Sequence, residues 1–204
     1  GLEKADSGEV WANGRKVNHA GPDRVVIFQE AALFPWLNVI KNVEFGLKLK
    51  GVSSRERRNI ALEYLKMVHL TRFQNAHIHE LSGGMKQRIQ IARVLANEPK
   101  MLLMDEPFAA LDAQTRALMQ EELTNIWQAT HTTVLFITHD IDEAVTLGNR
   151  IGVMRAGPRS QVKGVVEVAL NGARSRTDDV FLRYYKQVYE MIRDEVAKAI
   201  ARAT

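Results

Sequence analysis

The sequence contains no cysteine, which excludes disulfide bonds, cysteine-based zinc sites and thiol catalysis together. This absence agrees with a reducing compartment such as the cytoplasm. Long hydrophobic runs are absent too: the longest apolar stretches include Met101–Met104 and Val134–Ile137, and none approaches the roughly 18 residues that a transmembrane helix needs. The N-terminal residues show no basic segment followed by an apolar core, so we expect neither a membrane span nor a signal peptide.

The composition fits one globular domain with a subdomain inserted. Of the 204 residues, 46% are hydrophobic and 25% are charged, which allows a buried core and a soluble surface. The net charge of +4 is modest, and we expect no nucleic-acid partner. One basic cluster, at Arg55, Arg57 and Arg58, is best interpreted as a solvated helix face, with phosphate or lipid contact as the alternative.

Short apolar segments alternate with segments of helical periodicity in the second half of the chain. The sequence predicts strands at Val25–Phe28, Met101–Met104, Thr132–Thr138 and Ile151–Met154. This alternation favours a parallel sheet with helices on both faces. Residues 30–98 lack strand signals and are predicted to form a helical insertion, whereas Asn13-Gly14 predicts a hairpin near the start.

Several polar residues mark the expected helix ends. Ser53 with Glu56 forms a plausible capping box, and Ser82 and Asp112 are suited to begin further helices. Gly148 is a good C-cap. The last segment, residues 178–203, reads as an amphipathic helix that packs on the domain, with a membrane-surface helix as the alternative.

The stretch Ser82-Gly83-Gly84 is the first candidate for chemistry. A serine and two glycines at a helix start expose backbone N–H groups at the positive end of the helix dipole, and the missing Cβ atoms allow close approach of a ligand. This is a phosphate-binding arrangement. Taken alone, it is equally an ordinary serine-capped helix after a glycine turn.

Asp105 and Glu106 follow the apolar strand Met101–Met104 directly. In open parallel sheets the carboxyl ends of the strands line the ligand crevice, where Asp105 is suited to hold Mg²⁺ and Glu106 to accept a proton from water. The alternative is a helix N-terminus that attracts acidic residues. His139 and Gln29 also follow predicted strands, although each alone means little.

These stretches occur together and in a specific order: Phe28–Glu30, Leu81–Arg88, Leu102–Pro107, Ala110–Asp112 and Ile137–Asp140. In that order they resemble the Q-loop, signature motif, Walker B strand, D-loop and H-switch of the ABC ATPase family. The resemblance implies an α/β fold, a RecA-like P-loop NTPase core with an inserted α-helical subdomain. It further implies ATP and Mg²⁺ as cofactors and a pair of ATPase subunits, identical or different, that enclose two nucleotides.

The resemblance also implies a division of the chain into four segments. Residues 1–29 and 99–170 would belong to the RecA-like core, the first part being incomplete. Residues 30–98 would form the helical subdomain with the signature motif, and residues 171–204 a C-terminal helical segment.

Roles follow from the same resemblance. Glu106 would polarise the attacking water, His139 would touch the γ-phosphate, Asp105 would anchor Mg²⁺, and Gln29 would contact Mg²⁺ or the water.

The signature residues would act across the dimer. Ser82, Gly83, Gly84 and Gln87 would bind the nucleotide held by the opposite subunit, and Asp112 would couple the two sites.

One family feature is missing from the sequence. No G-x-x-x-x-G-K-[ST] occurs, so the Walker A phosphate cradle and its lysine are not present. Because every downstream motif keeps its expected residue, we expect truncation before Gly1, with the whole gene product being the active ATPase. The chain as given is expected neither to bind ATP tightly nor to hydrolyse it.

The segment Ala31–Val39 resembles importers of the nitrate, sulfonate and taurine group. This implies a cytoplasmic subunit on the inner face of the membrane, a permease that contacts the region near Phe34–Trp36, and an external solute-binding protein. The alternative for Phe34, Pro35 and Trp36 is burial in the core of this chain. The transported solute is not encoded in this subunit. Two alternatives stay open: a soluble ABC ATPase outside transport, and a non-catalytic binding or regulatory module.

Overall fold

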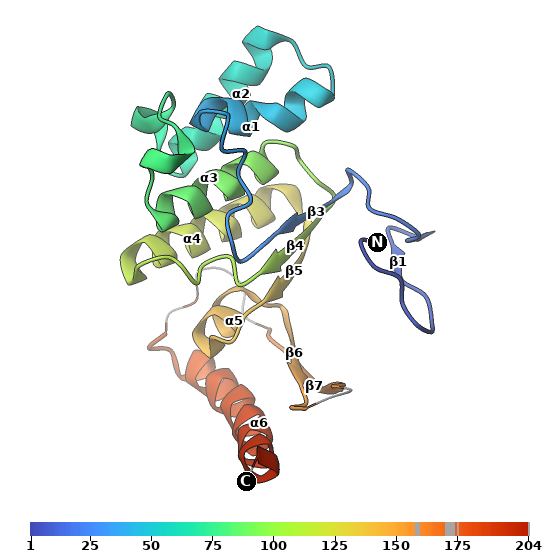
Figure 1. The fold of residues 1–204 in the computed structure, drawn as a ribbon. Coiled ribbons are helices and arrows are strands. Elements are labelled where there is room, and N and C mark those ends of the chain that lie inside the picture. Colours follow the sequence, from blue (N-terminus) through green and yellow to red (C-terminus); the bar gives the residue numbers. More distant parts are fainter. Residues whose placement is uncertain (158–159, 170–173, 175, 204) are drawn as a thin grey trace. The chain divides into compact units, whose positions relative to one another are not determined.

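The computed structural model of the chain describes residues 1–157, 160–169, 174 and 176–203 (Figure 1). The chain forms two compact units, residues 1–137 and 138–204. The four-segment division expected from the sequence, with boundaries at residues 29, 98 and 170, stays a prediction.

A three-stranded parallel sheet lies at the centre of the first unit. Its strands are β3 (Arg24–Ile27), β4 (Met101–Asp105) and β5 (Thr133–Ile137), in the order β3-β4-β5. Ile27 pairs with Met104, and Met104 with Phe136, so the three strands end at the same edge. The apolar runs thus form the predicted parallel strands, with ends that shift by at most one residue.

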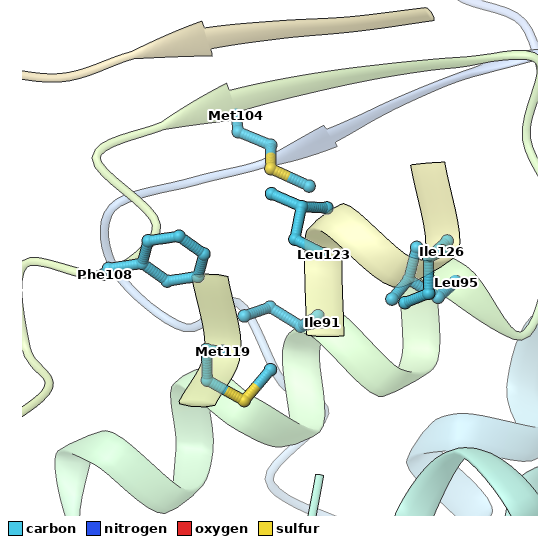
Figure 2. Close-up of a pocket in the computed structure, with 7 residues that line it drawn as sticks. All are labelled: Ile91, Leu95, Met104, Phe108, Met119, Leu123 and Ile126. Atoms are coloured by element: carbon cyan, nitrogen blue, oxygen red, sulfur yellow. The ribbon is translucent and has the colours of Figure 1, made fainter. Parts of the chain in front are cut away.

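One face of this sheet is covered by α3 (Gly83–Leu95) and α4 (Ala113–Thr130) (Figure 1). Leu102 and Met104 of β4 point into this layer and are buried. Side chains from both helices and from β4 enclose a small apolar cavity (Figure 2), lined by Ile91, Leu95, Met104, Phe108, Met119, Leu123 and Ile126.

The opposite face of the sheet differs from the expectation of helices on both faces. In the strand register, Leu103 lies beside Leu135, and Asp105 beside Ile137. Leu135 is 57% exposed and Ile137 is 53% exposed. Among the described residues of the first unit, the expected helical layer covers one face, while apolar side chains of β5 are exposed on the other.

Residues 30–98 are helical, as predicted. They contain α1, α2, two short 3₁₀ turns and α3, which span Val39–Leu49, Ser54–Met67, Thr71–Phe73, Ile78–Glu80 and Gly83–Leu95. Ser53 accepts a hydrogen bond from the backbone N–H of Glu56, and Ser82 accepts one from Met85. Both predicted N-caps are confirmed, because each hydroxyl satisfies an N–H group that the helix itself leaves unpaired.

The predicted hairpin is also present. The strands β1 (Trp11–Ala12) and β2 (Arg15–Lys16) pair antiparallel around Asn13 and Gly14. These two residues have φ angles of 49° and 71°, as a type I′ turn requires.

The second unit contains α5 (Ile141–Leu147), β6 (Arg150–Met154), β7 (Val162–Glu167) and α6 (Asp179–Ala203). The expectation that residues 151–154 continue the parallel sheet is wrong: β6 pairs antiparallel with β7 in a separate two-stranded sheet. The strand β7 is not evident in the sequence, because Lys163 and Gly164 interrupt its apolar pattern.

The last helix packs on this unit, as predicted. Phe181 and Val188 of α6 are buried with Val145 of α5, with Val153 of β6 and with Val166 of β7. Gly148 ends α5 as expected, although with an extended backbone; a Cβ there would lie 2.7 Å from the carbonyl oxygen of Ala144. Among the described residues, no helix is both long and apolar enough to cross a membrane.

Candidate functional site

Two acidic residues leave the sheet at the carboxyl end of β4. Asp105 is the last residue of this strand, pairs with Ile137 of β5 and is exposed. Glu106 follows with a φ of 43°, and its N–H donates to the carbonyl of Ile137 at 3.0 Å. A left-handed conformation is costly for a residue with a Cβ and is concentrated at functional sites. The backbone therefore turns at Glu106 and directs the chain away from the sheet.

Gln29 meets Glu106 although 77 positions separate them in the sequence. The amide Nε2 of Gln29 donates to Oε2 of Glu106 at 3.2 Å. The two residues meet because β3 and β4 are parallel neighbours, and Ile27 and Met104 pair two residues before each of them. The sheet therefore brings together two of the predicted catalytic residues.

The oxygen atoms at this edge fit a magnesium site. Asp105 and Glu106 offer carboxylates and Gln29 offers an amide oxygen, and Mg²⁺ prefers such hard ligands. The described residues contain no group of three or more histidine, cysteine, aspartate or glutamate side chains that could hold a metal. Mg²⁺ at this edge would therefore need ligand oxygens from a phosphate, as it commonly does.

The signature turn, Ser82-Gly83-Gly84 at the start of α3, has one open side and one packed side. A Cβ built on Gly83 would meet no described atom within 4 Å. A Cβ on Gly84 would lie 3.3 Å from Cδ2 of Leu111 and 3.6 Å from the carbonyl oxygen of Ala110. Gly84 is therefore explained by packing within the chain, whereas the space beside Gly83 is open for an external group.

Gln87 is placed differently from what the sequence suggested. Its side chain is 1% exposed, and its Nε2 donates to the carbonyl oxygen of Phe28 at 3.4 Å. The expected contact between Gln87 and a nucleotide does not fit this placement, because a buried amide that faces its own chain cannot reach a ligand outside it.

Asp112 begins α4 and accepts hydrogen bonds from Thr115 N and Thr115 Oγ1, at 3.0 and 2.7 Å. These bonds, the backbone one first, hold the pKa of Asp112 below its usual value. On α3, burial lowers the pKa of Arg88, and the negative charge of Asp112 opposes that shift. Asp112 thus acts electrostatically on the helix that carries the signature turn.

His139 belongs to the second unit, so its action together with Glu106 stays a prediction. It is exposed and lies between β5 and Asp140, the N-cap of α5. Hydrogen bonds anchor the residues next to His139. The Thr138 hydroxyl donates to Glu143 at 2.7 Å and accepts from the N–H of Asp140 at 3.0 Å.

Sequence reasoning missed the residue that shapes the loop after Gln29. Asn42 of α1 is fully buried, and its side chain forms four hydrogen bonds to the backbone of this loop. Its Oδ1 accepts from Phe34 N, and its Nδ2 donates to the carbonyls of Phe34, Leu37 and Asn38. Asn42 comes three positions after Val39 and directly before Val43, on the apolar face of α1, and a polar residue on that face was the available signal.

The same loop carries an aromatic cluster. The ring of Phe34 packs against Phe45 and Trp36, with centroids 4.4 and 5.5 Å apart. The guanidinium carbon of Arg93, on α3, lies 5.2 Å from the centroid of the Phe34 ring, within the range of a cation–π contact. Trp36 nevertheless stays 72% exposed. A rigid loop therefore presents a large aromatic side chain to the surroundings.

Comparison with known proteins shows the family of the chain. The family model described as "ABC transporter" matches residues 1–109. An uncharacterised ABC transporter ATP-binding protein of Methanocaldococcus jannaschii is 48% identical over 98% of this chain and 74% of its own length. A nitrate import ATP-binding protein of Synechocystis sp. is 51% identical over 78% of this chain and 59% of its own length.

A solved structure shows the same fold. It is a dimeric ATP-binding cassette in a post-hydrolysis state with ADP and Pi, and it matches with a TM-score of 0.73 and 36% identity. The match covers 82% of this chain and 76% of that one. The chain therefore belongs to the ABC transporter family, as an ATPase cassette with a RecA-like α/β fold.

Proposed function

We propose that this chain is part of the ATP-binding and ATP-hydrolysing subunit of an ABC importer that drives uptake of a nitrate-, sulfonate- or taurine-like solute. The contact between Gln29 and Glu106 at the carboxyl edge of the sheet carries the proposal. It joins an amide and a carboxylate that come from two strands and are 77 positions apart, where a triphosphate would meet water.

Each residue at this edge has a distinct task. Glu106 accepts the proton of the attacking water, and Gln29 orients both that water and the Glu106 carboxylate. Asp105 would hold Mg²⁺, which neutralises charge on the phosphate oxygens when bound. His139, in the second unit, has the separate proposed task of contacting the terminal phosphate.

A second cassette completes the site. The signature turn offers the N–H groups of a helix start, the Ser82 hydroxyl and the open space beside Gly83. These features fit a phosphate held by another subunit. The dimeric assembly of the related cassette supports this arrangement. Asp112, at the start of α4, would connect the two sites.

The membrane partner would dock at the aromatic loop. Trp36 is exposed on a loop that Asn42 fixes, and exposed aromatic side chains on rigid backbone are frequent anchors of protein interfaces. The similarity to a nitrate import protein supports a permease as this partner, with an external solute-binding protein acting on the permease. The subunit would then lie on the cytoplasmic face of the membrane.

The catalytic part is tested with Glu106→Gln in the full-length protein. The variant should bind ATP as the wild type does and hydrolyse it about 10²- to 10⁴-fold more slowly, because the general base is lost while the side-chain shape is kept. ATP turnover and nucleotide affinity are measured on the same preparation. Unchanged turnover would exclude Glu106 as the base, and an inactive wild type would favour the non-catalytic module.

The transport part is tested by co-purification with a candidate permease subunit. Trp36→Ala should weaken the complex and leave the basal ATPase rate of the free subunit unchanged, since Trp36 lies on the surface. Leu49→Ala is a matched control, because Leu49 is an equally exposed apolar residue at the other end of α1. Stable complexes with both variants would contradict docking at this loop.

A further inference from the structure

Two buried glutamines on α3 differ in what they contact. Gln87 and Gln90 are three residues apart and are almost completely buried. The amide of Gln87 donates to the carbonyl of Phe28. Within the described part of the chain, neither Nε2 nor Oε1 of Gln90 has a hydrogen-bond partner. The same side chain in the same helix therefore has a specific backbone target in one case only.

The acceptor of Gln87, the Phe28 carbonyl, lies just beyond the end of β3 and directly before Gln29. β3 ends at Ile27, so Phe28 and Gln29 have left the sheet and its ladder of hydrogen bonds. The Phe28 carbonyl that accepts from Gln87 belongs to the peptide bond between Phe28 and Gln29. The side-chain amide of Gln29 in turn donates to the Glu106 carboxylate at 3.2 Å. A continuous chain of contacts thus runs from the signature helix to the carboxylate.

We propose that Gln87 is a positioning residue that sets the direction of Gln29, and through it the carboxylate of Glu106. This inference rests on the proposed ATPase function and concerns the same site. Since Gln87 lies inside α3, five residues after Ser82, it also connects the signature turn with the residue that orients the water. A phosphate bound at that turn would act on the same helix.

The consequence for catalysis is a loss of rate without a loss of binding. Gln87 is buried and its amide faces its own chain, so its removal should leave nucleotide affinity unchanged. A carboxylate or amide displaced by a fraction of an ångström lowers the rate of the chemical step, by about ten-fold as an order of magnitude. The KM for ATP should change much less than kcat.

The experiment compares Gln87→Met with Gln90→Met in the full-length protein. Methionine keeps the length of the side chain and removes the donor in both variants. Gln87→Met should reduce kcat about ten-fold, whereas Gln90→Met should keep the wild-type rate. Gln87→Asn, which withdraws the amide by one methylene, should give an intermediate rate and retains a polar side chain in case the methionine variant folds poorly.

A double-mutant cycle separates positioning from general damage to the helix. If Gln87 acts through Gln29, then Gln87→Met should cause little further loss in a Gln29→Ala background. Additive losses in the cycle would overturn the proposal, because a merely structural defect is independent of Gln29.

A measurement without turnover completes the test. Amide hydrogen exchange of the peptide that contains Phe28–Ala31 should be faster in Gln87→Met than in wild type and unchanged in Gln90→Met. Equal exchange and equal kcat in the two variants would sink the inference while leaving the ATPase function intact. Absence of turnover in the wild type would instead refute the proposed function itself.

Discussion

The two ends of α3 are built on opposite principles. At the beginning, Ser82 and Gly83 are exposed, and a Cβ on Gly83 would stand in open space. At the end, a Cβ on Gly46 of α1 would lie 2.2 Å from Oδ1 of Asn97, and the Asn97 amide donates to the carbonyl of Arg93 at 2.7 Å. The space beside Gly83 is open to another molecule, whereas the space beside Gly46 is filled by the Asn97 side chain.

The difference separates residues that serve function from residues that serve folding. A glycine that no neighbour requires points to a ligand outside the chain, whereas a glycine pressed against its own chain is explained by packing. Substitution of Gly83 should therefore change activity with little effect on stability, whereas crowding at the end of α3 should lower stability with little effect on activity.

The largest expected effect is on activity, at the open end. Gly83→Ala in the full-length protein should lower the ATPase rate at least about ten-fold, because the added methyl group stands where the phosphate would approach. The free energy of unfolding should change by less than about 0.5 kcal/mol, since the methyl group meets no neighbour. Turnover assays and urea denaturation measure the two quantities.

Gly84→Ala is the matched control for this prediction. Its Cβ would lie 3.3 Å from Leu111, so this variant should lose both activity and about 1 kcal/mol of stability. The comparison between the two ends of α3 breaks down if Gly83→Ala is as unstable as Gly84→Ala, or if it is fully active.

The packed end should respond in stability. Gly46→Ala adds a methyl group where Asn97 stands, and forces that side chain to leave the carbonyl of Arg93. Overpacking costs about 1–3 kcal/mol, and alanine regains about 1 kcal/mol of helix propensity, so we expect a net loss of about 1 kcal/mol. Urea denaturation measures the change, and nucleotide affinity should stay constant. A more stable variant would show that α1 and α3 can separate here at no cost.

The sequence predicted the elements that local chemistry determines. Ser82 and Asp112 begin helices because their side-chain oxygens bind N–H groups three residues ahead, and Asn13-Gly14 makes the turn that its φ angles require. The meeting of Gln29 with Glu106 could also be expected, because strand ends align in a parallel sheet.

What sequence reasoning missed depends on contacts between distant segments. Gln87 is polar and follows the signature turn, as a nucleotide-binding residue would. Only its burial and its hydrogen bond to the Phe28 carbonyl show that it contacts its own chain. Asn42 lies on the buried face of α1 with Val39 and Val43, and only the loop that folds over it explains a polar residue there. Lys163 interrupts the apolar pattern of β7. Its ammonium group is paired with Glu195 of α6 at 3.0 Å, a contact that the sequence does not reveal. Tertiary contacts of this kind leave no periodic signal.

The smallest expected effect concerns pH and tests whether the region beside the open end is electrostatically organised. Hydrogen bonds from Thr115 lower the pKa of Asp112 in the folded state, so its stabilising contribution is complete above the ordinary aspartate pKa of about 3.9 and is lost as the pH falls through the lower folded value.

In Asp112→Asn the side-chain oxygen still caps α4 but carries no charge. The stability difference between wild type and this variant should therefore shrink on going from pH 7 to pH 3, measured by urea denaturation at both values. A difference that is independent of pH would mean that the hydrogen bonds to Asp112 stabilise α4 without depending on its charge.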